Sequence, residues 1–426
     1  MFKLIRHISN PVLKPDPSIP WETEGVFNPG VTELSSGEVA LLYRAVGERD
    51  SYISHIGLAK SKDGVVFERY IDNSSSDIAS GPEASNVPKP VFGPSTEFDT
   101  WATEDPRITK IGDDFYITYV AVPERIMDHN QGIERKLPLE TATALLKTKD
   151  FITFENLGII SPRHSDNKDI VLFPRKIMGP YHKDVEPTEM HFVDDRGICP
   201  TMDIPEKSGD TEEGEDSKGI RLDKKPRYAM LHRPNRWDKI WSAGEYRHAI
   251  NVPLPCEIDL LPTLPSIWIA WSDDLIHWTH HQLLLSPSHQ SDAKIGPGLP
   301  PIETPDGWLM IYHHVEKQDA VENTDPNLRK PEKFIYSVRV ALLDLENPTK
   351  IIGKLPYDIL YPEAPYETEH GTEIIFPTGG FIKDGKLHVY YGASDYSIGL
   401  ATGSLDELLV ELKKEGIDGK TRHETT

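Results

Sequence analysis

The sequence predicts an all-β protein: a five-bladed β-propeller with a short C-terminal helix and one long acidic insertion. Its 426 residues include 36 prolines and 30 glycines, so many turns separate short elements. Three kinds of strand-like segment recur five times in a constant order, in units of roughly 60 to 90 residues, as propeller blades do. Two β-sandwich domains, the alternative, would not repeat the same three segments in order.

The first two kinds of segment follow each other directly. The first begins with polar residues, continues as an apolar strand and has a proline near the same place. We expect it at 26–31, 104–112, 168–174, 294–298 and 373–377. The second is a β-rich strand that ends in polar groups, expected at 39–44, 115–119, 228–233, 308–314 and 387–395.

The third kind is a strand of small residues followed by a Ser/Thr-x-Asp turn or a relative of it. It is expected at 56–63, 143–150, 267–274, 338–344 and 398–406. An aromatic residue follows the aspartate by four positions in three of the turns: Phe67, Phe154 and Trp278. Because aspartate accepts backbone N–H bonds at such turns and the aromatic ring packs beneath the hairpin, this pattern is interpreted as structural.

We expect one propeller domain over residues 1–426, with two additions. The insertion, at about 180–226 within the third blade, has an acidic core over 206–216 that is nearly free of apolar residues. It cannot bury enough surface to order itself, which predicts a mobile surface loop or an oligomer contact. The helix, at about 404–415, has four leucines at helical spacing and is expected to pack outside the last blade.

Composition excludes several classes of partner. A formal net charge of −22 disfavours nucleic acid and anionic membranes but leaves room for a local basic pocket. The only two cysteines, Cys199 and Cys256, indicate no disulfide framework and are typical of a reducing compartment. The sequence has no apolar span of about 20 residues and no signal-peptide pattern at its start. We expect a cytoplasmic protein, possibly a homo-oligomer.

The stretch 103–108 is the most informative one. Pro106 fixes its own φ and biases Asp105 toward an extended conformation, which places Glu104 and Asp105 on opposite sides of the backbone. One carboxylate then faces a cavity while the other is held structurally. Taken alone, the stretch is more typical of a turn at the start of a strand with a surface ion pair.

The repeat favours a functional interpretation, because polar residues of the innermost strands converge at one mouth of a propeller. The candidates from first segments are Asn28, Glu104, Asp105, Arg107, Lys168, Asp169, Lys294 and Glu373. Those from second segments are Arg44, Tyr119, His232, Arg233, Tyr312, His313 and Asp395. Each alone is typical of a solvated or paired surface group, but five equivalent positions that mix cations with carboxylates predict a binding site.

Other chemistries have little support. The pairs His280-His281 and His313-His314 are neighbours that point to opposite faces of a strand, so neither pair can hold one ion and no metal is expected. The sequence has no P-loop, no GxGxxG at a helix start, no CxxC and no GxSxG. The chemistry that remains is that of carboxylates beside a pocket that binds an anion.

The motifs resemble glycoside hydrolase family 130, the β-mannoside phosphorylases and related β-1,2-mannosidases, from about residue 25 to about residue 405. The motifs that carry this resemblance are 28–30, 104–108, 167–174, 231–234, 294–301, 312–313, 376–379 and 391–395. The resemblance implies a five-bladed propeller and inverting phosphorolysis of a β-mannosidic bond, which releases α-mannose 1-phosphate.

The resemblance also implies roles for the candidate residues. Asp105 is the general acid, which delivers its proton through a hydroxyl of the mannosyl unit. Phosphate binds to Lys168, Arg233, Lys294 and His313. Substrate contacts come from Asn28, Arg44, Glu104, Tyr119, Asp169, His232, Tyr312, Glu373 and Asp395. No cofactor is expected beyond inorganic phosphate as co-substrate.

Two departures and two alternatives accompany this interpretation. His314 stands where the family usually has glycine and Arg175 where an acidic residue is common, both expected near the phosphate pocket. One alternative is an inverting β-mannosidase, which needs a base such as Glu104, Asp169 or Glu373 to activate water. The other is a sugar-binding propeller without catalysis. The sequence leaves the acceptor and the linkage, β-1,2 or β-1,4, open.

Overall fold

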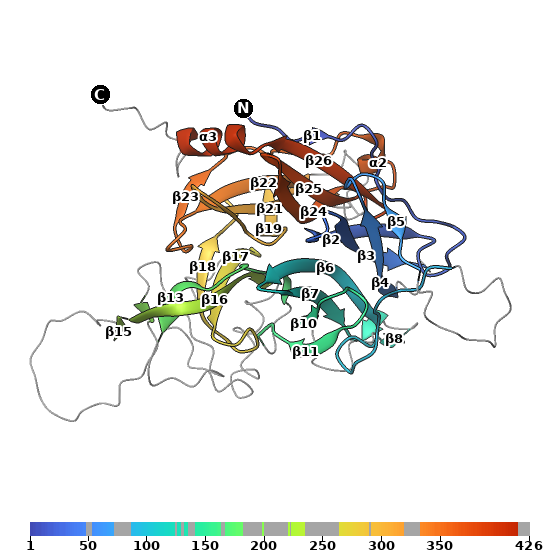
Figure 1. Ribbon diagram of the computed structural model, residues 1–426, viewed down its shortest axis with the longest axis horizontal. Helices are drawn as coiled ribbons and strands as arrows, with labels where there is room; N and C mark the ends of the chain where they lie inside the picture. Colours follow the sequence, from blue (N-terminus) through green and yellow to red (C-terminus); the bar gives the residue numbers. More distant parts are fainter. Residues whose placement is uncertain are drawn as a thin grey trace, which may run out of the picture.

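The computed structural model shows a protein built mostly of antiparallel strands. It describes residues 1–47, 53–71, 87–123, 126–128, 132–134, 141–162, 167–181, 198–199, 220–221, 223–234, 264–288, 291–318 and 333–415. In Figure 1 the sheets lie around a shared centre in chain order, from blue on the right through green and yellow to red at the top. The prediction of an all-β protein is confirmed at this level.

Three groups of strands are separate antiparallel sheets. The first contains β2 (Gly25–Glu33), β3 (Val39–Val46), β4 (Ser54–Ser61) and β5 (Glu68–Arg69). The second contains β6 (Ala102–Ile111), β7 (Asp114–Val122), β10 (Ala142–Thr148) and β11 (Glu155–Ile159). The third contains β12 (Asn167–Leu172), β16 (Asp223–Pro234), β17 (Ile267–Ser272) and β18 (Trp278–Leu285), with β13 (Ile177–Tyr181) beside β16.

The fourth and fifth groups share one nine-stranded sheet. The fourth contains β19 (Asp292–Pro297), β21 (Gly307–Gln318), β22 (Lys333–Leu343) and β23 (Ile351–Lys354), with β20 (Ile302–Thr304) beside β21. The fifth contains β24 (Glu373–Lys383), β25 (Lys386–Ala393), β26 (Ser397–Ser404) and β1 (Ile5–Arg6). A short parallel pairing of β22 with β24 joins the two groups.

All three kinds of predicted segment are strands, and they form the first three strands of each group in the predicted order. The first strands meet at the centre, where β2 contacts β6 and β24, and β12 contacts β6 and β19. The sequence analysis did not predict the fourth strands. In the fifth group this strand is β1, so the first and the last strand of the described chain pair in one sheet.

The hydrophobic core is divided among clusters that each join two consecutive groups. One cluster packs Leu42 of the first group against Ile117 of the second, and another packs Met230 of the third group against Leu145 of the second. Comparable clusters join the third group to the fourth, the fourth to the fifth and the fifth to the first. Each sheet therefore buries both faces, and the packing passes around the whole set of groups.

The predicted Asp turns are confirmed as structural. Asp63 Oδ1 accepts the backbone N–H groups of Val65 and Val66, both at 2.9 Å. Asp150 and Asp274 make the equivalent bonds at their own turns. These bonds fix the hairpins after the third strands of the first three groups.

The two additions differ in how far the structure tests them. The predicted C-terminal helix is α3 (Leu405–Glu415), which packs against β26 and β23 with Leu408 and Leu412 fully buried. The insertion begins and ends in a paired ribbon, in which Ile177 opposite Arg227 is the first of five pairs. Its acidic core, 206–216, lies outside the described residues.

A second short helix is α2 (Pro365–Thr368). The remaining short strand pairs are β8 (Ile126–Asp128) with β9 (Gly132–Glu134) and β14 (Ile198–Cys199) with β15 (Ile220–Arg221).

The helices of the described chain are too short or too polar to cross a membrane.

Candidate active site

Three polar residues near the starts of first strands adopt an unusual backbone conformation. Asn28, Asp105 and Asp169 have positive φ angles of 47°, 49° and 61°. Each lies at a shift in the pairing register of its strand, β2, β6 or β12. Asn and Asp tolerate this left-handed region better than other side chains, and bulges of this kind redirect side chains beside active sites.

The conformation of Asp105 corrects a prediction. The sequence analysis expected an extended Asp105, with Glu104 on the opposite side of the backbone, and this was wrong. The bulge in β6 overrides the local bias from Pro106, and both carboxylates contact Arg44. Arg44 NH1 lies 3.2 Å from Asp105 Oδ1, and NH2 lies 2.9 Å from Glu104 Oε1. A left-handed non-glycine residue costs on the order of 1–3 kcal/mol, which the surrounding bonds must offset.

Asp105 is also held by an amide. Asn28 Nδ2 donates to Asp105 Oδ1 at 2.8 Å. Gly392 in β25 makes room for this contact, because a Cβ there would lie 2.0 Å from Asn28 Oδ1. Asn28, Arg44 and Asp105 therefore converge on one point, as the sequence analysis expected of them.

Arg107 connects Asp105 to a second carboxylate. Its NH1 donates to the backbone carbonyl of Asp105 at 3.1 Å and its NH2 to Asp169 Oδ1 at 2.9 Å. The other oxygen of Asp169 accepts Arg233 Nε at 2.6 Å. Burial alone would raise the pKa of Asp169, but Arg233 and Arg107 outweigh it and hold that pKa well below its usual range. Asp169 is thus an ionised, fully buried bridge between two guanidinium groups.

His313 lies beside this bridge with unused hydrogen-bonding capacity. It is fully buried, and neither ring nitrogen has a hydrogen-bond partner among the described residues. Its Nε2 is 3.8 Å from Asp169 Oδ2. Gly296 is required opposite, since a Cβ there would lie 2.4 Å from His313 Cε1. Burial lowers the pKa of His313 well below its usual value, and the cations Arg233 and Lys294 add to this effect.

Lys168 and Asp395 complete the cluster. Lys168 lies opposite Arg233 in the β12–β16 pairing, and its Nζ contacts Glu104 Oε2 at 3.3 Å. Asp395 follows β25 with a φ of 51°. Burial raises the pKa of Asp395 to about 6; Arg44 opposes this rise, whereas Asp105 and Glu104 add to it.

Sequence reasoning missed two aromatic members. Tyr336 in β22 lies under Lys294, whose Nζ is 5.1 Å from the ring centroid, and burial raises the pKa of Tyr336 to about 12. Phe376 in β24 packs on His313, with ring centroids 4.7 Å apart. Tyr336 lies two residues before the third segment expected at 338–344, so no predicted segment included it. Phe376 lay in a motif but has no polar group.

Four predicted contact residues make their bonds and contacts outside the cluster, and their assignment to it is corrected here. Tyr119 is in the core between the first two groups, where its hydroxyl donates to Asp99 Oδ2 at 2.9 Å. His232 bonds to Asn167 and His281, and Tyr312 packs in the core that joins the third and fourth groups. Glu373 pairs with Lys333. Because successive strand residues face opposite sides, Arg233 and His313 reach the cluster while His232 and Tyr312 do not.

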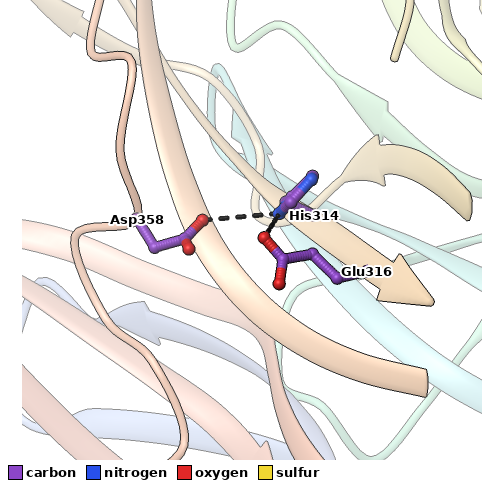
Figure 2. Close-up of side chains that lie close together, drawn as sticks. All are labelled: His314, Glu316 and Asp358. Carbon is purple, nitrogen blue, oxygen red and sulfur yellow. Dashed lines mark ion pairs between the residues drawn. The ribbon is translucent and has the colours of Figure 1, made fainter. Parts of the chain in front are cut away.

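The two departures from the family pattern also lie away from the cluster. Arg175 is on the surface and forms a two-bonded pair with Glu303, so its expected place near a phosphate pocket was wrong. His314 faces away from His313, as predicted, and its Nδ1 lies 3.4 Å from Asp358 Oδ1 and 4.0 Å from Glu316 Oε1 (Figure 2).

The side chains in Figure 2 lie close enough together to hold a cation, yet their charges are already paired. Asp358 Oδ1 accepts Arg339 Nε at 2.7 Å, and His314 Nε2 lies 2.7 Å from Asp292 Oδ1. Burial alone would raise the pKa of Asp358, but His314 and Arg339 lower it to about 2. A guanidinium bound to the same oxygen opposes a second cation, so we interpret this group as an ion-pair cluster.

The central cluster combines three features needed for displacement by an anion. Asp105 is a carboxylate held by neutral and cationic donors, Asp169 is a fixed bridge, and Arg233, Lys294 and Lys168 supply positive charge. Such a pocket can orient a dianion and neutralise its charge beside a proton donor.

Several known proteins are similar to this chain in sequence. The sequence model of a family described as β-1,4-mannooligosaccharide phosphorylase, glycoside hydrolase family 130, matches residues 5–194 and 261–414. A 1,2-β-oligomannan phosphorylase from Thermoanaerobacter sp. (strain X514) is 29% identical over 94% of this chain and 97% of its own. A β-1,2-mannobiose phosphorylase from Listeria innocua serovar 6a is 27% identical over 85% of this chain and 70% of its own.

A solved structure supports the fold. The β-1,2-mannobiose phosphorylase from Listeria innocua, in complex with β-1,2-mannobiose, superposes with a TM-score of 0.61 at 24% identity. The match covers 96% of this chain and 99% of that one. The described sheets therefore have the arrangement seen in that protein.

Proposed function

The chain belongs to glycoside hydrolase family 130, and from this membership we infer that it is an enzyme, a mannoside phosphorylase. It cleaves a β-mannosidic bond of a mannosyl di- or oligosaccharide with inorganic phosphate and releases α-mannose 1-phosphate. The site assignments below are proposals that rest on the geometry of the central cluster.

The observation that carries this function is the buried His313, whose two ring nitrogens have no hydrogen-bond partner among the described residues and which is set among Arg233, Lys294 and Lys168. We assign these four residues to phosphate. Arginine binds phosphate through its planar fork, and a neutral imidazole can donate one hydrogen bond without adding charge. Tyr336 lies next to Lys294 and adds a hydroxyl to the same wall.

Asp105 is the proposed general acid. A phosphate oxygen forms a bond to the anomeric carbon as the bond from that carbon to the leaving oxygen breaks. The proton of Asp105 passes to a mannosyl hydroxyl, whose own proton goes to the leaving oxygen, so the acceptor departs neutral. Attack from the face opposite the leaving group inverts the anomeric centre. Asn28, Arg44 and Asp395 hold the mannosyl hydroxyls.

Asp169 is a positioning residue in this account. Its two oxygens hold Arg107 and Arg233, and Arg107 in turn holds the backbone of Asp105. The acid and the phosphate pocket are therefore parts of one bonded unit. This role replaces the direct sugar contact that the sequence analysis expected of Asp169.

Phosphorolysis is favoured over hydrolysis by the state of the three carboxylates that could activate water. Glu104 pairs with Arg44 and Lys168, and Asp169 pairs with two arginines. Glu373, at the start of β24, pairs with Lys333. A carboxylate held by cations is a weak base, whereas attacking phosphate needs no base.

We propose that the fold is a single five-bladed β-propeller over residues 1–426. Its support is the five groups of strands whose first strands meet at the centre. The hydrophobic clusters between consecutive groups, including the fifth and the first, also support it. The pairing of β1 with β26 would then close the ring.

We propose β-1,2-linked mannosides as the substrates. The two relatives described above span 85–94% of this chain and are named for that linkage. The family description names the β-1,4 linkage, which makes it the competing prediction.

The test is incubation of the purified protein with β-1,2-mannobiose or β-1,4-mannosyl-glucose, with and without phosphate. We expect phosphate-dependent mannose 1-phosphate from β-1,2-mannobiose. Reaction of only the β-1,4 substrate would overturn the linkage, and free mannose regardless of phosphate would overturn the phosphorylase.

A further inference from the structure

Two aromatic side chains stack at the mouth where the cluster lies. Asn28, Asp105 and Lys168 all lie near the starts of their first strands, so the start of β24 is at this mouth too. The end of β25 is there as well, because Ala393 pairs with Ile375. His370 precedes β24 and Tyr396 follows β25, next to Asp395. Their ring centroids are 3.8 Å apart, with an interplanar angle of 20°.

The backbone around this pair is fixed. Thr372 Oγ1 lies 2.9 Å from Ser394 Oγ, and Ser394 N donates to Ile374 O at 3.0 Å, which ties the two loops together. Tyr396 O accepts Val26 N at 3.0 Å, two residues before Asn28. The pair is thus held in register with the inner strand that contacts Asp105.

The rings are also accessible. His370 is exposed and Tyr396 is half-buried, whereas Phe376 inside the cluster is buried. A half-exposed aromatic ring that is already ordered can bind a ligand without a large loss of side-chain entropy. The apolar faces of pyranose rings pack on flat aromatic surfaces of this kind, and carbohydrate subsites need such a surface beside a few polar groups.

We propose that the Tyr396–His370 pair is the platform for the acceptor sugar, the unit on the leaving side of the cleaved bond. This inference rests on the proposed function, since it takes the mannosyl unit to be held by Asp105, Asn28 and Asp395. Tyr396 adjoins Asp395 in the chain, so a sugar that extends from the mannosyl unit toward the mouth meets this ring first. The ligand class is mannose or a short β-mannoside.

The test uses the synthetic direction, with α-mannose 1-phosphate as donor and mannose or β-1,2-mannobiose as acceptor. Tyr396→Ala and His370→Ala should each raise the acceptor KM about 5- to 10-fold, the loss expected for one aromatic contact. The KM for α-mannose 1-phosphate should stay within about twofold of the wild-type value. Tyr396→Phe keeps the ring and should restore the acceptor KM.

The chain offers a matched control. His388 and Phe381 stack with an interplanar angle of 14°. They lie in the β24–β25 hairpin, at the end that is farther from Asp395. His388→Ala should leave both KM values unchanged. Because His370 is exposed, His370→Ala keeps the test decisive even if Tyr396→Ala fails to fold.

Three outcomes separate this inference from the function on which it rests. An unchanged acceptor KM in His370→Ala and Tyr396→Ala overturns the platform and leaves the phosphorylase intact. An equal rise in both KM values also overturns it, because the pair would then support the mannosyl site. A wild-type protein that makes no disaccharide from α-mannose 1-phosphate overturns the function itself.

Discussion

His313 and His314 are neighbours on β21, yet they belong to two buried polar clusters of opposite character. His313 has no hydrogen-bond partner on either ring nitrogen among the described residues. His314 has both nitrogens occupied, with Nε2 at 2.7 Å from Asp292 and Nδ1 at 3.4 Å from Asp358. Both side chains are fully buried, so exposure does not explain the difference.

The clusters around His313 and His314 also differ in backbone conformation and in charge. The cluster around His313 includes the left-handed residues Asn28, Asp105 and Asp169, whereas the residues drawn in Figure 2 have ordinary φ angles. Its cations lower the pKa of His313, while carboxylates surround His314. Unsatisfied buried groups and strained backbone are costly and mark places where a ligand completes the bonding. Fully paired groups indicate a structural role.

The largest expected effect is on the proton donor. Asp105→Asn removes the acid and should lower kcat about 10³-fold while changing the KM for the mannoside only a few fold. Asp358→Asn, a matched change in the His314 cluster, should leave kcat within about twofold. Steady-state formation of mannose 1-phosphate measures both. Substantial turnover by Asp105→Asn would remove it as the acid.

The next effect concerns the two carboxylates that hold arginines. Asp169→Asn leaves Arg107 and Arg233 without their partner, so it should destabilise the fold by about 3–5 kcal/mol and raise the phosphate KM about 100-fold. Asp358→Asn should also lower stability but leave the phosphate KM unchanged. Urea unfolding and phosphate saturation curves measure the two quantities. If both variants shifted the phosphate KM equally, the two clusters would not be functionally distinct.

The histidines give a smaller and sharper contrast. His313→Gln should raise the phosphate KM about tenfold with little change in unfolding free energy, because its ring nitrogens have no hydrogen-bond partner in the part of the chain that the structure describes. His314→Gln should cost about 1–3 kcal/mol of stability and leave the phosphate KM within twofold. The reverse pattern in these two measurements would contradict the comparison.

The smallest effect is a pH dependence. The pKa of Asp395 is raised to about 6, so this carboxylate becomes neutral below that pH and loses its charge-assisted bonds to sugar hydroxyls. The kcat/KM for the mannoside should therefore fall about tenfold for each pH unit well below 6. In Asp395→Asn this decrease of kcat/KM at low pH should be absent. If the decrease persisted in the variant, it would come from the titration of another group.

The same group affects stability in a defined direction. The folded protein binds this proton more tightly than the unfolded chain, in which the carboxyl has its ordinary pKa of 3.8. The contribution of Asp395 to stability is therefore highest below about pH 4 and decreases as the pH rises to about 6. Chemical denaturation at several pH values should show a smaller decrease in Asp395→Asn.

The strands and the polar ring could be predicted because they rest on short-range patterns. Polar residues at the start of each first segment, followed by an apolar run, marked Asn28, Asp105 and Lys168. Alternation also predicted that His313 and His314 face opposite sides. It could not tell which neighbour faces the centre, and so it placed His232 and Tyr312 in the cluster along with Arg233 and His313.

The features that the sequence analysis did not predict depend on long-range packing. Pro106 predicted an extended Asp105, but the β6 bulge sets that residue at a φ of 49°. Tyr336 reaches the cluster only because β22 pairs with both β21 and β24, which no local pattern reveals. The two-residue strand β1 is too short to give a periodic pattern, although it completes the fifth group.

The central claim is that phosphate attacks the anomeric carbon from the pocket of Arg233 and His313. Proton NMR of the reaction of β-1,2-mannobiose with excess inorganic phosphate, followed from the first minutes, tests it most directly. We expect α-mannose 1-phosphate as the first product, at a rate that follows phosphate concentration. Free mannose in twofold excess over the cleaved disaccharide, formed at a rate independent of phosphate, would contradict the account.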